Sequence, residues 1–374
     1  MTGNTLALMV TPNAGEECLR SATRSRAVEG IGRCDLEIET LRGDAAHIAF
    51  FHGTRRIQFF LDAAEEQLME ERVLFQSDGE TLVGTLFRPD GVEGPLPTVV
   101  AGGGWCYVKE IVLPHVARIV AEQQVQFLGF DYRGFGESSG ARRQHIDPWE
   151  QIADYKNALS YVETRDDVDA QQLGVFGISY SGGHALVLAA TDSRVKAAVS
   201  VVPVVEGYDN MRRAHGEVAF AELEAAILAD RRIRAGGGEG ATLRMSSLEP
   251  WKELSTWPFP RIGEVFNKLR ESGEAERHEH WSTLESTELL LNYSVFPFLP
   301  RILDKKVMMI VAEGDNITMW DREIAAFNDI ASPAKRLEIL PSVSHMSLYS
   351  DQRDTNVAAA KAADWFGSAF SSSN

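Results

Sequence analysis

The 374-residue chain is 44% hydrophobic and 24% charged, a composition typical of globular proteins that excludes the disordered, collagen-like and coiled-coil classes. Its length predicts two domains, or one large α/β domain with insertions. Acidic residues outnumber basic ones by 54 to 37, and the resulting net charge of −17 repels a phosphate backbone, so we expect no nucleic-acid partner.

Cysteine usage and hydropathy bear on the compartment. Cys18, Cys34 and Cys106 are too few and too scattered to form a disulfide framework or a zinc site, which fits a reducing compartment. No apolar run approaches the roughly 18 residues that a membrane span requires, and the N-terminus lacks the basic region of a signal peptide. We therefore expect a cytoplasmic protein with no membrane partner.

The predicted elements begin after an N-terminal extension, residues 1–70, in which we find no chemistry. Residues 71–87 alternate like a β-hairpin, and from about residue 94 short β-branched runs alternate with amphipathic helices. This alternation predicts a mostly parallel central sheet with helices on both faces. After the hairpin the predicted strands are 98–101, 125–132, 173–176, 195–202, 307–312 and 337–340, and helices begin near Pro114 and at Pro148, where Asp147 is the expected N-cap.

The alternation of predicted strands and helices stops between residues 206 and 300. This stretch contains a helical segment over 217–233, a glycine-rich loop over 236–240, and many aromatic residues and prolines. A structureless loop of this length is implausible inside a compact domain. We therefore predict a helical lid insertion, residues 206–300, over one end of a core formed by residues 71–205 and 301–374.

The strongest local motif is Gly-Val-Phe-Gly-Ile-Ser-Tyr-Ser-Gly-Gly at residues 174–183, a strand that enters a tight turn and then an apolar helix. A serine on such a sharp turn is projected clear of the sheet, provided that the residues two before and two after it are small; here they are Gly177 and Ser181. The helix N-terminus behind it offers N–H groups to an oxyanion. The motif predicts Ser179 as a nucleophile.

This motif and the order of the elements resemble the α/β-hydrolase superfamily, in particular its dienelactone-hydrolase-like and X-Pro-dipeptidyl-peptidase-like esterase branches. The resemblance covers residues 72–370, although Ser181 stands where the family pattern has glycine. It implies an α/β fold of the α/β-hydrolase type and a chain order of nucleophile, acid and histidine.

The resemblance and the chain order together select a base and an acid. Of nine histidines, only His345 follows the final predicted strand, so it is the predicted base. Asp315 follows the strand 307–312, where the family's acid usually falls, and is expected to accept the Nδ1 proton of the histidine. Glu313 and Asp321 are nearby alternatives for the acid. The other histidines are assigned surface or packing roles.

Residues 102–109, which we call the glycine loop, follow an early strand where the family usually reads His-Gly-x-Gly-Gly. The resemblance implies that the backbone N–H groups of Trp105 and Tyr180 form the oxyanion hole, while Gly103 replaces the usual histidine. No lysine–serine or lysine–threonine pair follows, which argues against a phosphate-binding loop. The family-like segment 130–138 predicts a structural role for Arg133 through ion pairs.

The sequence therefore predicts a serine hydrolase with a Ser179–His345–Asp315 triad and an acyl-enzyme intermediate, requiring no metal and no organic cofactor. We expect the substrate to be a small carboxylic ester with an apolar or aromatic portion, because aromatic residues fill the insertion. Thioester or polyketide acyl transfer, amide hydrolysis, hydrolysis of a carbon–carbon bond beside a ketone, and a non-catalytic binding protein remain alternatives. The oligomeric state, a homo-oligomer included, stays open.

Overall fold

The computed structural model describes residues 36–39, 45–52, 55–62 and 68–371. The chain divides into two units, residues 1–65 and 66–374, so the second unit begins about five residues before the predicted boundary. Cys18 and Cys34 lie outside the described residues. In the first unit, three antiparallel strands lie in the order β1, β2, β3. The three strands are β1 (Leu36–Glu39), β2 (Ala45–His52) and β3 (Arg55–Asp62).

The second unit is built on an eight-stranded sheet with the order β13-β12-β9-β8-β6-β7-β5-β4. The six strands from β7 to β13 in this order are mutually parallel, whereas β5 is antiparallel to both of its neighbours. The predicted hairpin and mostly parallel sheet are thus confirmed. The strands are β4 (Leu68–Ser77), β5 (Glu80–Pro89), β6 (Leu96–Gly102), β7 (Gln126–Phe130), β8 (Val168–Ile178), β9 (Val195–Val201), β12 (Lys306–Ala312) and β13 (Lys335–Leu340).

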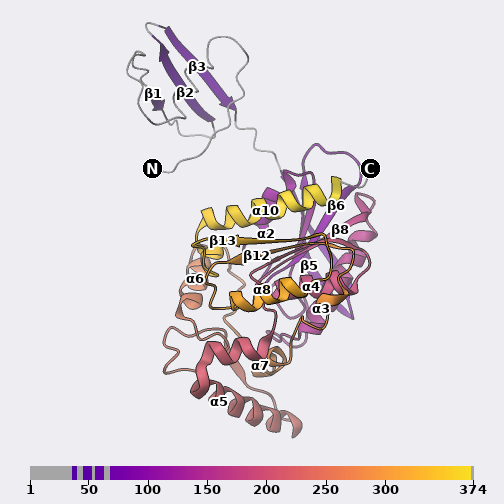
Figure 1. Ribbon diagram of the computed structural model, residues 1–374, viewed down its shortest axis with the longest axis vertical. Helices are drawn as coiled ribbons and strands as arrows, with labels where there is room; N and C mark the ends of the chain where they lie inside the picture. Colours follow the sequence, from indigo (N-terminus) through magenta and orange to yellow (C-terminus); the bar gives the residue numbers. More distant parts are fainter. Residues whose placement is uncertain (1–35, 40–44, 53–54, 63–67, 372–374) are drawn as a thin grey trace. The chain divides into compact units, whose positions relative to one another are not determined.

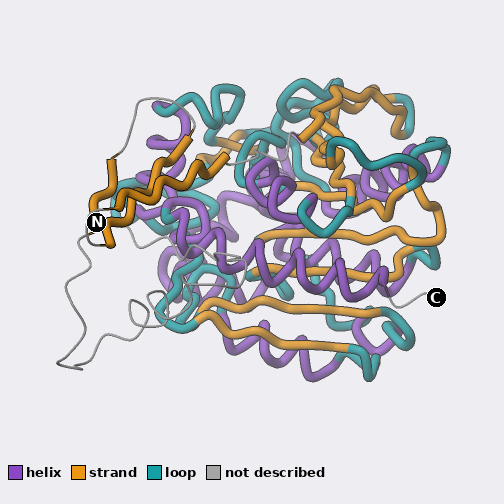
Figure 2. The backbone as a smooth tube through the Cα atoms, turned by 90° about the horizontal axis from the view of Figure 1, so that it is seen from above, coloured by secondary structure: helices purple, strands orange, loops and turns teal. Residues whose placement is uncertain are grey.

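Helices cover both faces of this sheet. Helices α2 and α10 pack together on one face, and α3, α4 and α8 lie on the other, as Figure 1 shows. In Figure 2 helices run alongside the strands. Because both faces are covered, the central strands are continuous apolar runs instead of alternating ones. These helices are α2 (Leu113–Ala121), α3 (Pro148–Glu163), α4 (Tyr180–Thr191), α8 (Trp320–Asp329) and α10 (Gln352–Ser371).

Two local predictions about the core are also confirmed. Helix α3 begins at Pro148, and the Asp147 side chain accepts hydrogen bonds from the next two free N–H groups of the first turn. The Arg133 guanidinium forms ion pairs with Asp154 at 2.7 Å and Asp78 at 3.0 Å, which tie its loop to α3 and to the β4–β5 turn.

The segment between β9 and β12, which we call the insertion, contains three helices and one short 3-10 helix. It also contains a two-stranded sheet of β10 and β11 that the sequence did not predict, because each strand has only three residues. Helix α5 bends at Gly216, whose φ is +68°. The elements are α5 (Gly207–Ala235), β10 (Thr242–Arg244), α6 (Pro260–Glu271), β11 (Trp281–Thr283), α7 (Leu284–Leu291) and η1 (Leu299–Arg301).

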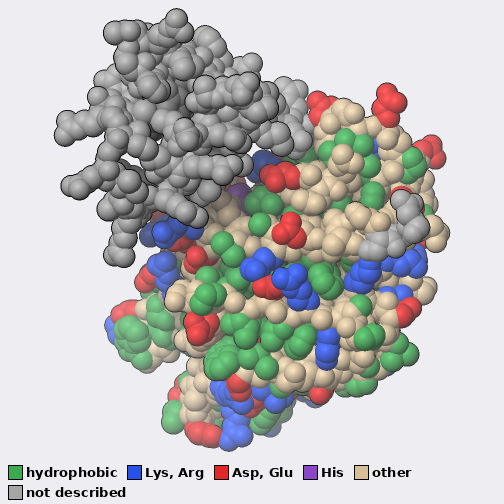
Figure 3. Space-filling view, turned by 45° about the horizontal axis from the view of Figure 1, so that its top comes forward, with side chains coloured by type: hydrophobic (Ala, Val, Ile, Leu, Met, Phe, Trp, Pro, Cys, Tyr) green, Lys and Arg blue, Asp and Glu red, His purple; other side chains and the backbone are tan. Residues whose placement is uncertain are grey.

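Aromatic side chains of the insertion pack into the same hydrophobic core as the sheet, among them Trp257, Phe266 and Tyr293, each at most 3% exposed. On the face that Figure 3 shows, acidic and basic side chains are interspersed with apolar ones. Within the described ranges, no helix combines the length and apolar character needed to cross a membrane.

Candidate active site

Ser179 lies at the sharp turn between β8 and α4. Its φ of 59° and ψ of −120° are a strained combination for a residue with a side chain, and the Ser179 N–H donates to the Val201 carbonyl at 2.9 Å. A Cβ at Gly177 would collide with the Ser181 carbonyl, so only glycine fits there. The Ser181 hydroxyl accepts a hydrogen bond from the Ile178 N–H at 2.8 Å and lies 2.7 Å from the Gly102 carbonyl, to which it donates. Serine at this family position therefore ties the turn to the glycine loop.

Three predicted side chains meet at the carboxyl ends of the strands. His345 Nε2 lies 3.2 Å from Ser179 Oγ, and His345 Nδ1 lies 2.8 Å from Asp315 Oδ2. We call these three residues the candidate triad. They are 8%, 4% and 2% exposed for serine, histidine and aspartate respectively. Because a carboxylate can only accept, Nδ1 carries the proton and Nε2 is left to accept from the serine hydroxyl.

The Asp315 carboxylate is held by its own loop. Its Oδ1 accepts from the N–H groups of Ile317 at 2.8 Å and Thr318 at 3.1 Å, and its Oδ2 accepts from the Thr318 hydroxyl at 2.9 Å. Burial alone would raise the pKa of Asp315, but the electrostatic interaction and hydrogen bond with His345, together with the N–H groups of Thr318 and Ile317, bring it below its ordinary value. The group is therefore ionised at neutral pH.

The two alternative acids lie elsewhere. The Glu313 side chain is exposed and accepts from the Ser342 N–H at 3.0 Å. Asp321 is also exposed and forms an ion pair with Arg213 at 2.8 Å. Of these three carboxylates, Asp315 is the one that is hydrogen-bonded to His345.

A second buried acid, Glu323, lies behind the candidate triad, and the sequence analysis did not single it out. Its Oε1 is 2.7 Å from the Thr318 hydroxyl, and its Oε2 is buried without a hydrogen-bond partner. Burial, followed by the charge of Asp315, raises the pKa of Glu323 well above its ordinary value. A neutral Glu323 can donate to Thr318 while Thr318 donates to Asp315, so the pair orients the carboxylate without adding charge.

The two residues predicted to supply N–H donors, Trp105 and Tyr180, belong to segments that lie beside the nucleophile. Tyr180 is the first residue of α4, where N–H groups have no intrahelical acceptor. On the other side, a Cβ at Gly104 would lie only 3.1 Å from the Ser179 Cβ, so the absence of a side chain lets the loop approach the serine. The Trp105 and Tyr180 rings are buried in edge contact, with centroids 5.1 Å apart.

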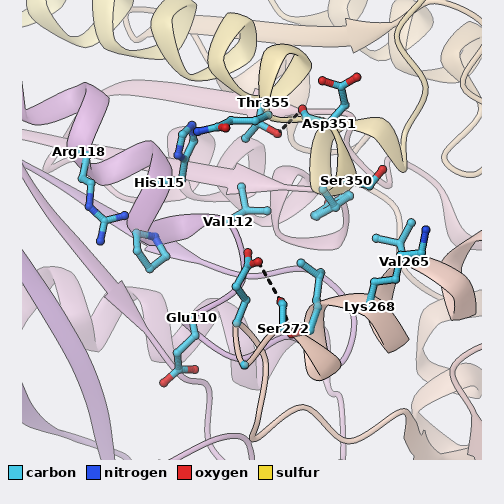
Figure 4. Close-up of a pocket in the computed structure, with 16 residues that line it drawn as sticks. Glu110, Val112, His115, Arg118, Val265, Lys268, Ser272, Ser350, Asp351 and Thr355 are labelled. Carbon is cyan, nitrogen blue, oxygen red and sulfur yellow. Dashed lines mark hydrogen bonds between the residues drawn. The ribbon is translucent and has the colours of Figure 1, made fainter. Parts of the chain in front are cut away.

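A pocket of about 720 Å³ opens between the core and the insertion (Figure 4). Tyr349 lines this pocket, and its ring centroid lies 5.8 Å from that of His345, so the tyrosine is in contact with both the pocket and the candidate triad. The walls come from α2, from α6 and from α9 (Ser347–Ser350) with the start of α10. The lining mixes apolar and charged side chains, including Val112, Val265, Leu269, Arg118, Lys268 and Asp351.

Among the described residues, one cluster of three acidic side chains is close enough together to hold a metal ion. It consists of Glu110, Asp131 and Glu137. The Lys109 ammonium lies among these carboxylates, at 2.8, 3.2 and 2.6 Å respectively. Burial raises the pKa of Asp131 to about 6 although Lys109 opposes the shift. The lysine already supplies the counter-charge, so these residues do not indicate a metal centre.

With this fold and geometry established, comparison with known proteins gives the class. The family model described as alpha/beta hydrolase fold matches residues 99–352, and the chain belongs to this family. The predicted resemblance to α/β-hydrolases is confirmed.

Individual proteins that are similar to this chain have names more specific than that of the family. The chain is 27% identical over 288 residues to a polyketide transferase of Penicillium crustosum, covering 75% of this chain and 92% of the relative. It is 28% identical over 287 residues to a thiohydrolase of Eupenicillium brefeldianum, covering 75% and 88%. Among solved structures, the alpha/beta hydrolase GrgF from Penicillium sp. sh18 is similar in fold, with a TM-score of 0.68 and 22% identity over 81% of this chain and 100% of that chain.

Proposed function

We propose that this protein is a serine-dependent acyl-transfer enzyme in which Ser179 is the nucleophile, His345 the general base and Asp315 the acid that orients the histidine. The observation that carries the proposal is the unbroken sequence of contacts from Ser179 Oγ to His345 Nε2 and from His345 Nδ1 to Asp315 Oδ2. A serine hydroxyl is a weak nucleophile until such a base removes its proton.

The proposed reaction has two halves. Ser179 Oγ attacks the acyl carbonyl carbon as its proton passes to His345 Nε2, and the N–H groups of Trp105 and Tyr180 stabilise the oxyanion. Collapse of the tetrahedral intermediate breaks the bond to the leaving group, which takes the proton from His345. An acceptor hydroxyl, amine or water then attacks the acyl carbon of the acyl-serine and gives its proton to His345. The bond from the acyl carbon to Ser179 Oγ breaks, Oγ takes that proton back from His345, and the acyl product leaves.

We propose a thioester as the acyl donor, with a carboxylic ester, the substrate predicted from sequence, as the second candidate. The names of the relatives, a thiohydrolase and a polyketide transferase, favour the thioester. A thiol has a pKa near 8.5, so a departing thiolate needs less help from the histidine than an alkoxide does. The pocket beside Tyr349, with its apolar and charged lining, is the proposed site for the acyl donor.

A rapid-quench experiment with one acyl group presented as a thioester and as an ethyl ester tests this function. We expect a burst of free thiol equal to the enzyme concentration, an acyl-enzyme visible in the intact mass, and a smaller rate from the ethyl ester. Ser179→Ala is the control and should give neither burst nor mass change. Adding an alcohol or amine acceptor separates transfer from hydrolysis through the product formed. Thiol release without any acyl-enzyme, at an unchanged rate in Ser179→Ala, would contradict the proposal.

A further inference from the structure

The glycine loop contains a strained residue that the insertion holds from outside. Cys106, directly after Trp105, has a φ of +60°, in the left-handed region that residues other than glycine rarely adopt. The Tyr107 N–H donates to the Gly104 carbonyl at 3.3 Å, which closes a four-residue turn with Cys106 in its third position. Turns that need a positive φ there usually carry glycine or asparagine, so the cysteine requires external support.

Two groups of the insertion supply this support. His278 Nδ1 lies 2.9 Å from the Cys106 carbonyl oxygen, and the Cys106 thiol donates to the Trp281 carbonyl at 3.3 Å. The Phe266 ring packs against His278 at 4.7 Å and against Tyr107 at 5.3 Å between centroids. The carbonyl and the thiol of the strained Cys106 are therefore both held by groups of the insertion.

The hydrogen bonds around His278 have one consistent direction. A carbonyl can only accept, so His278 Nδ1 carries the proton and its Nε2 accepts from His280 Nδ1 at 3.1 Å. His280 Nε2 then accepts from the Ser246 hydroxyl at 2.7 Å. This arrangement requires neutral rings, and burial lowers the pKa of His278 to about 3 and that of His280 to about 4.

The turn connects these hydrogen bonds to the proposed oxyanion donor beside the nucleophile. The Gly104 carbonyl and the Trp105 N–H belong to one planar peptide unit and point in opposite directions. Because Tyr107 holds the Gly104 carbonyl, the direction of the Trp105 N–H depends on the shape of the turn, and that shape depends on Cys106. Sequence reasoning assigned His278 a surface or packing role. The ring is buried, at 4% exposed, which excludes the surface role, and it is also hydrogen-bonded to the glycine loop.

We propose that His278 is a positioning residue, which fixes the Cys106 carbonyl and thereby aims the Trp105 N–H at the oxyanion. This inference rests on the proposed function, because it assigns a support to the proposed oxyanion donor. In this inference the insertion contributes to transition-state stabilisation and also lines the pocket.

A matched pair of variants tests the proposal. His278→Asn keeps an N–H donor close to the position of Nδ1, whereas His278→Leu has the same shape as asparagine and no donor. We expect kcat to fall by roughly 10- to 100-fold in His278→Leu, since complete loss of one oxyanion donor costs about 10²- to 10³-fold. The KM should change by less than about 3-fold, because the Trp105 N–H stabilises only the transition state. His278→Asn should recover most of the loss in kcat, because asparagine keeps an N–H donor to the Cys106 carbonyl.

Three further measurements complete the test. The affinity for an alkylboronic acid, which forms a tetrahedral adduct on a serine, should fall in His278→Leu in proportion to kcat/KM. His215→Leu is the control, since His215 also lies in the insertion but bonds to the Met211 and Ser255 carbonyls, away from the glycine loop. Thermal unfolding of each variant identifies any that fail to fold.

Equal loss in His278→Leu and His278→Asn, or a kcat in a folded His278→Leu equal to that of the unmodified protein, would overturn the inference while leaving the proposed function intact. Failure of the proposed function gives a different result, namely an unmodified protein that forms no acyl-enzyme.

Discussion

The core sheet and the insertion contribute to the candidate site in different ways. In the core, Ser179, Asp315 and His345 follow the ends of β8, β12 and β13. These strands are parallel members of one sheet, in which β9 lies between β8 and β12. In the insertion, His278 and Trp281 reach the glycine loop through hydrogen bonds made outside that sheet. The candidate triad thus follows strands of the regular sheet, whereas the glycine loop is held by hydrogen bonds from the irregular segment.

The largest expected effect concerns the core side of this comparison. Ser179→Ala and His345→Ala should each lower kcat by about 10⁵- to 10⁶-fold, because neither half of acyl transfer proceeds without the nucleophile and its base. Steady-state turnover of a thioester, with circular dichroism to verify folding, measures this. The double variant should be no worse than either single one, and additive losses would mean that the two residues do not act as a unit.

Asp315→Asn is expected to come next, with a loss in kcat of about 10⁴-fold and an intact fold. An asparagine amide can donate to His345 Nδ1, which would leave the proton on Nε2 and remove the acceptor that the serine needs. The same turnover assay measures the effect. If Glu313→Gln lost comparable activity while Asp315→Asn kept it, the acid would have to be reassigned.

The sequence predicted those residues of the candidate site that directly follow predicted strands. The small residues around Ser179 predicted where its side chain would lie. The chain order implied by the resemblance, applied to the last two predicted strands, selected Asp315 and His345. His278 carries no such pattern, because its partner is 172 residues away and only the packing of the insertion brings the two together.

The second unit illustrates the same limit at the level of the fold. The alternation of short apolar runs with amphipathic stretches predicted the parallel sheet and the helices on its faces. Strands β10 and β11 have three residues each and no readable period. Glu323 was missed because a buried, neutral acid in a helix looks in sequence like any first-turn carboxylate.

The pH dependence of stability compares the two regions directly. Burial lowers the pKa of His184 in the core and of His278 in the insertion to about 3, so below the ordinary histidine value of about 6.5 the unfolded chain binds protons that the folded protein does not. Stability should therefore fall as pH drops from about 6.5 towards 4, by about 1.4 kcal/mol per pH unit for each histidine.

Urea unfolding at pH 7, 6 and 5 measures this slope. Both His184→Gln and His278→Gln should flatten it, because aromatic side chains of the insertion share one hydrophobic core with the sheet and both histidines should then report on one transition. If only His184→Gln changed the slope, the insertion would unfold separately from the core.

The smallest effect is expected for Glu323→Gln. Burial raises the pKa of Glu323 well above its ordinary value, which favours the neutral form, and a glutamine amide can replace the donation of a neutral Glu323 to the Thr318 hydroxyl. We expect kcat within about 3-fold of the unmodified protein, in contrast to Asp315→Asn. A loss as large as that of Asp315→Asn would mean that Glu323 carries the charge behind His345.

Reaction with a fluorophosphonate, followed by intact-mass measurement and peptide mapping, tests the activated serine most directly. The account predicts a single adduct on Ser179, formed rapidly in the unmodified protein, slowly in Asp315→Asn and not at all in Ser179→Ala. A folded protein that forms no adduct, or one that is modified equally fast after Ser179→Ala, would contradict it.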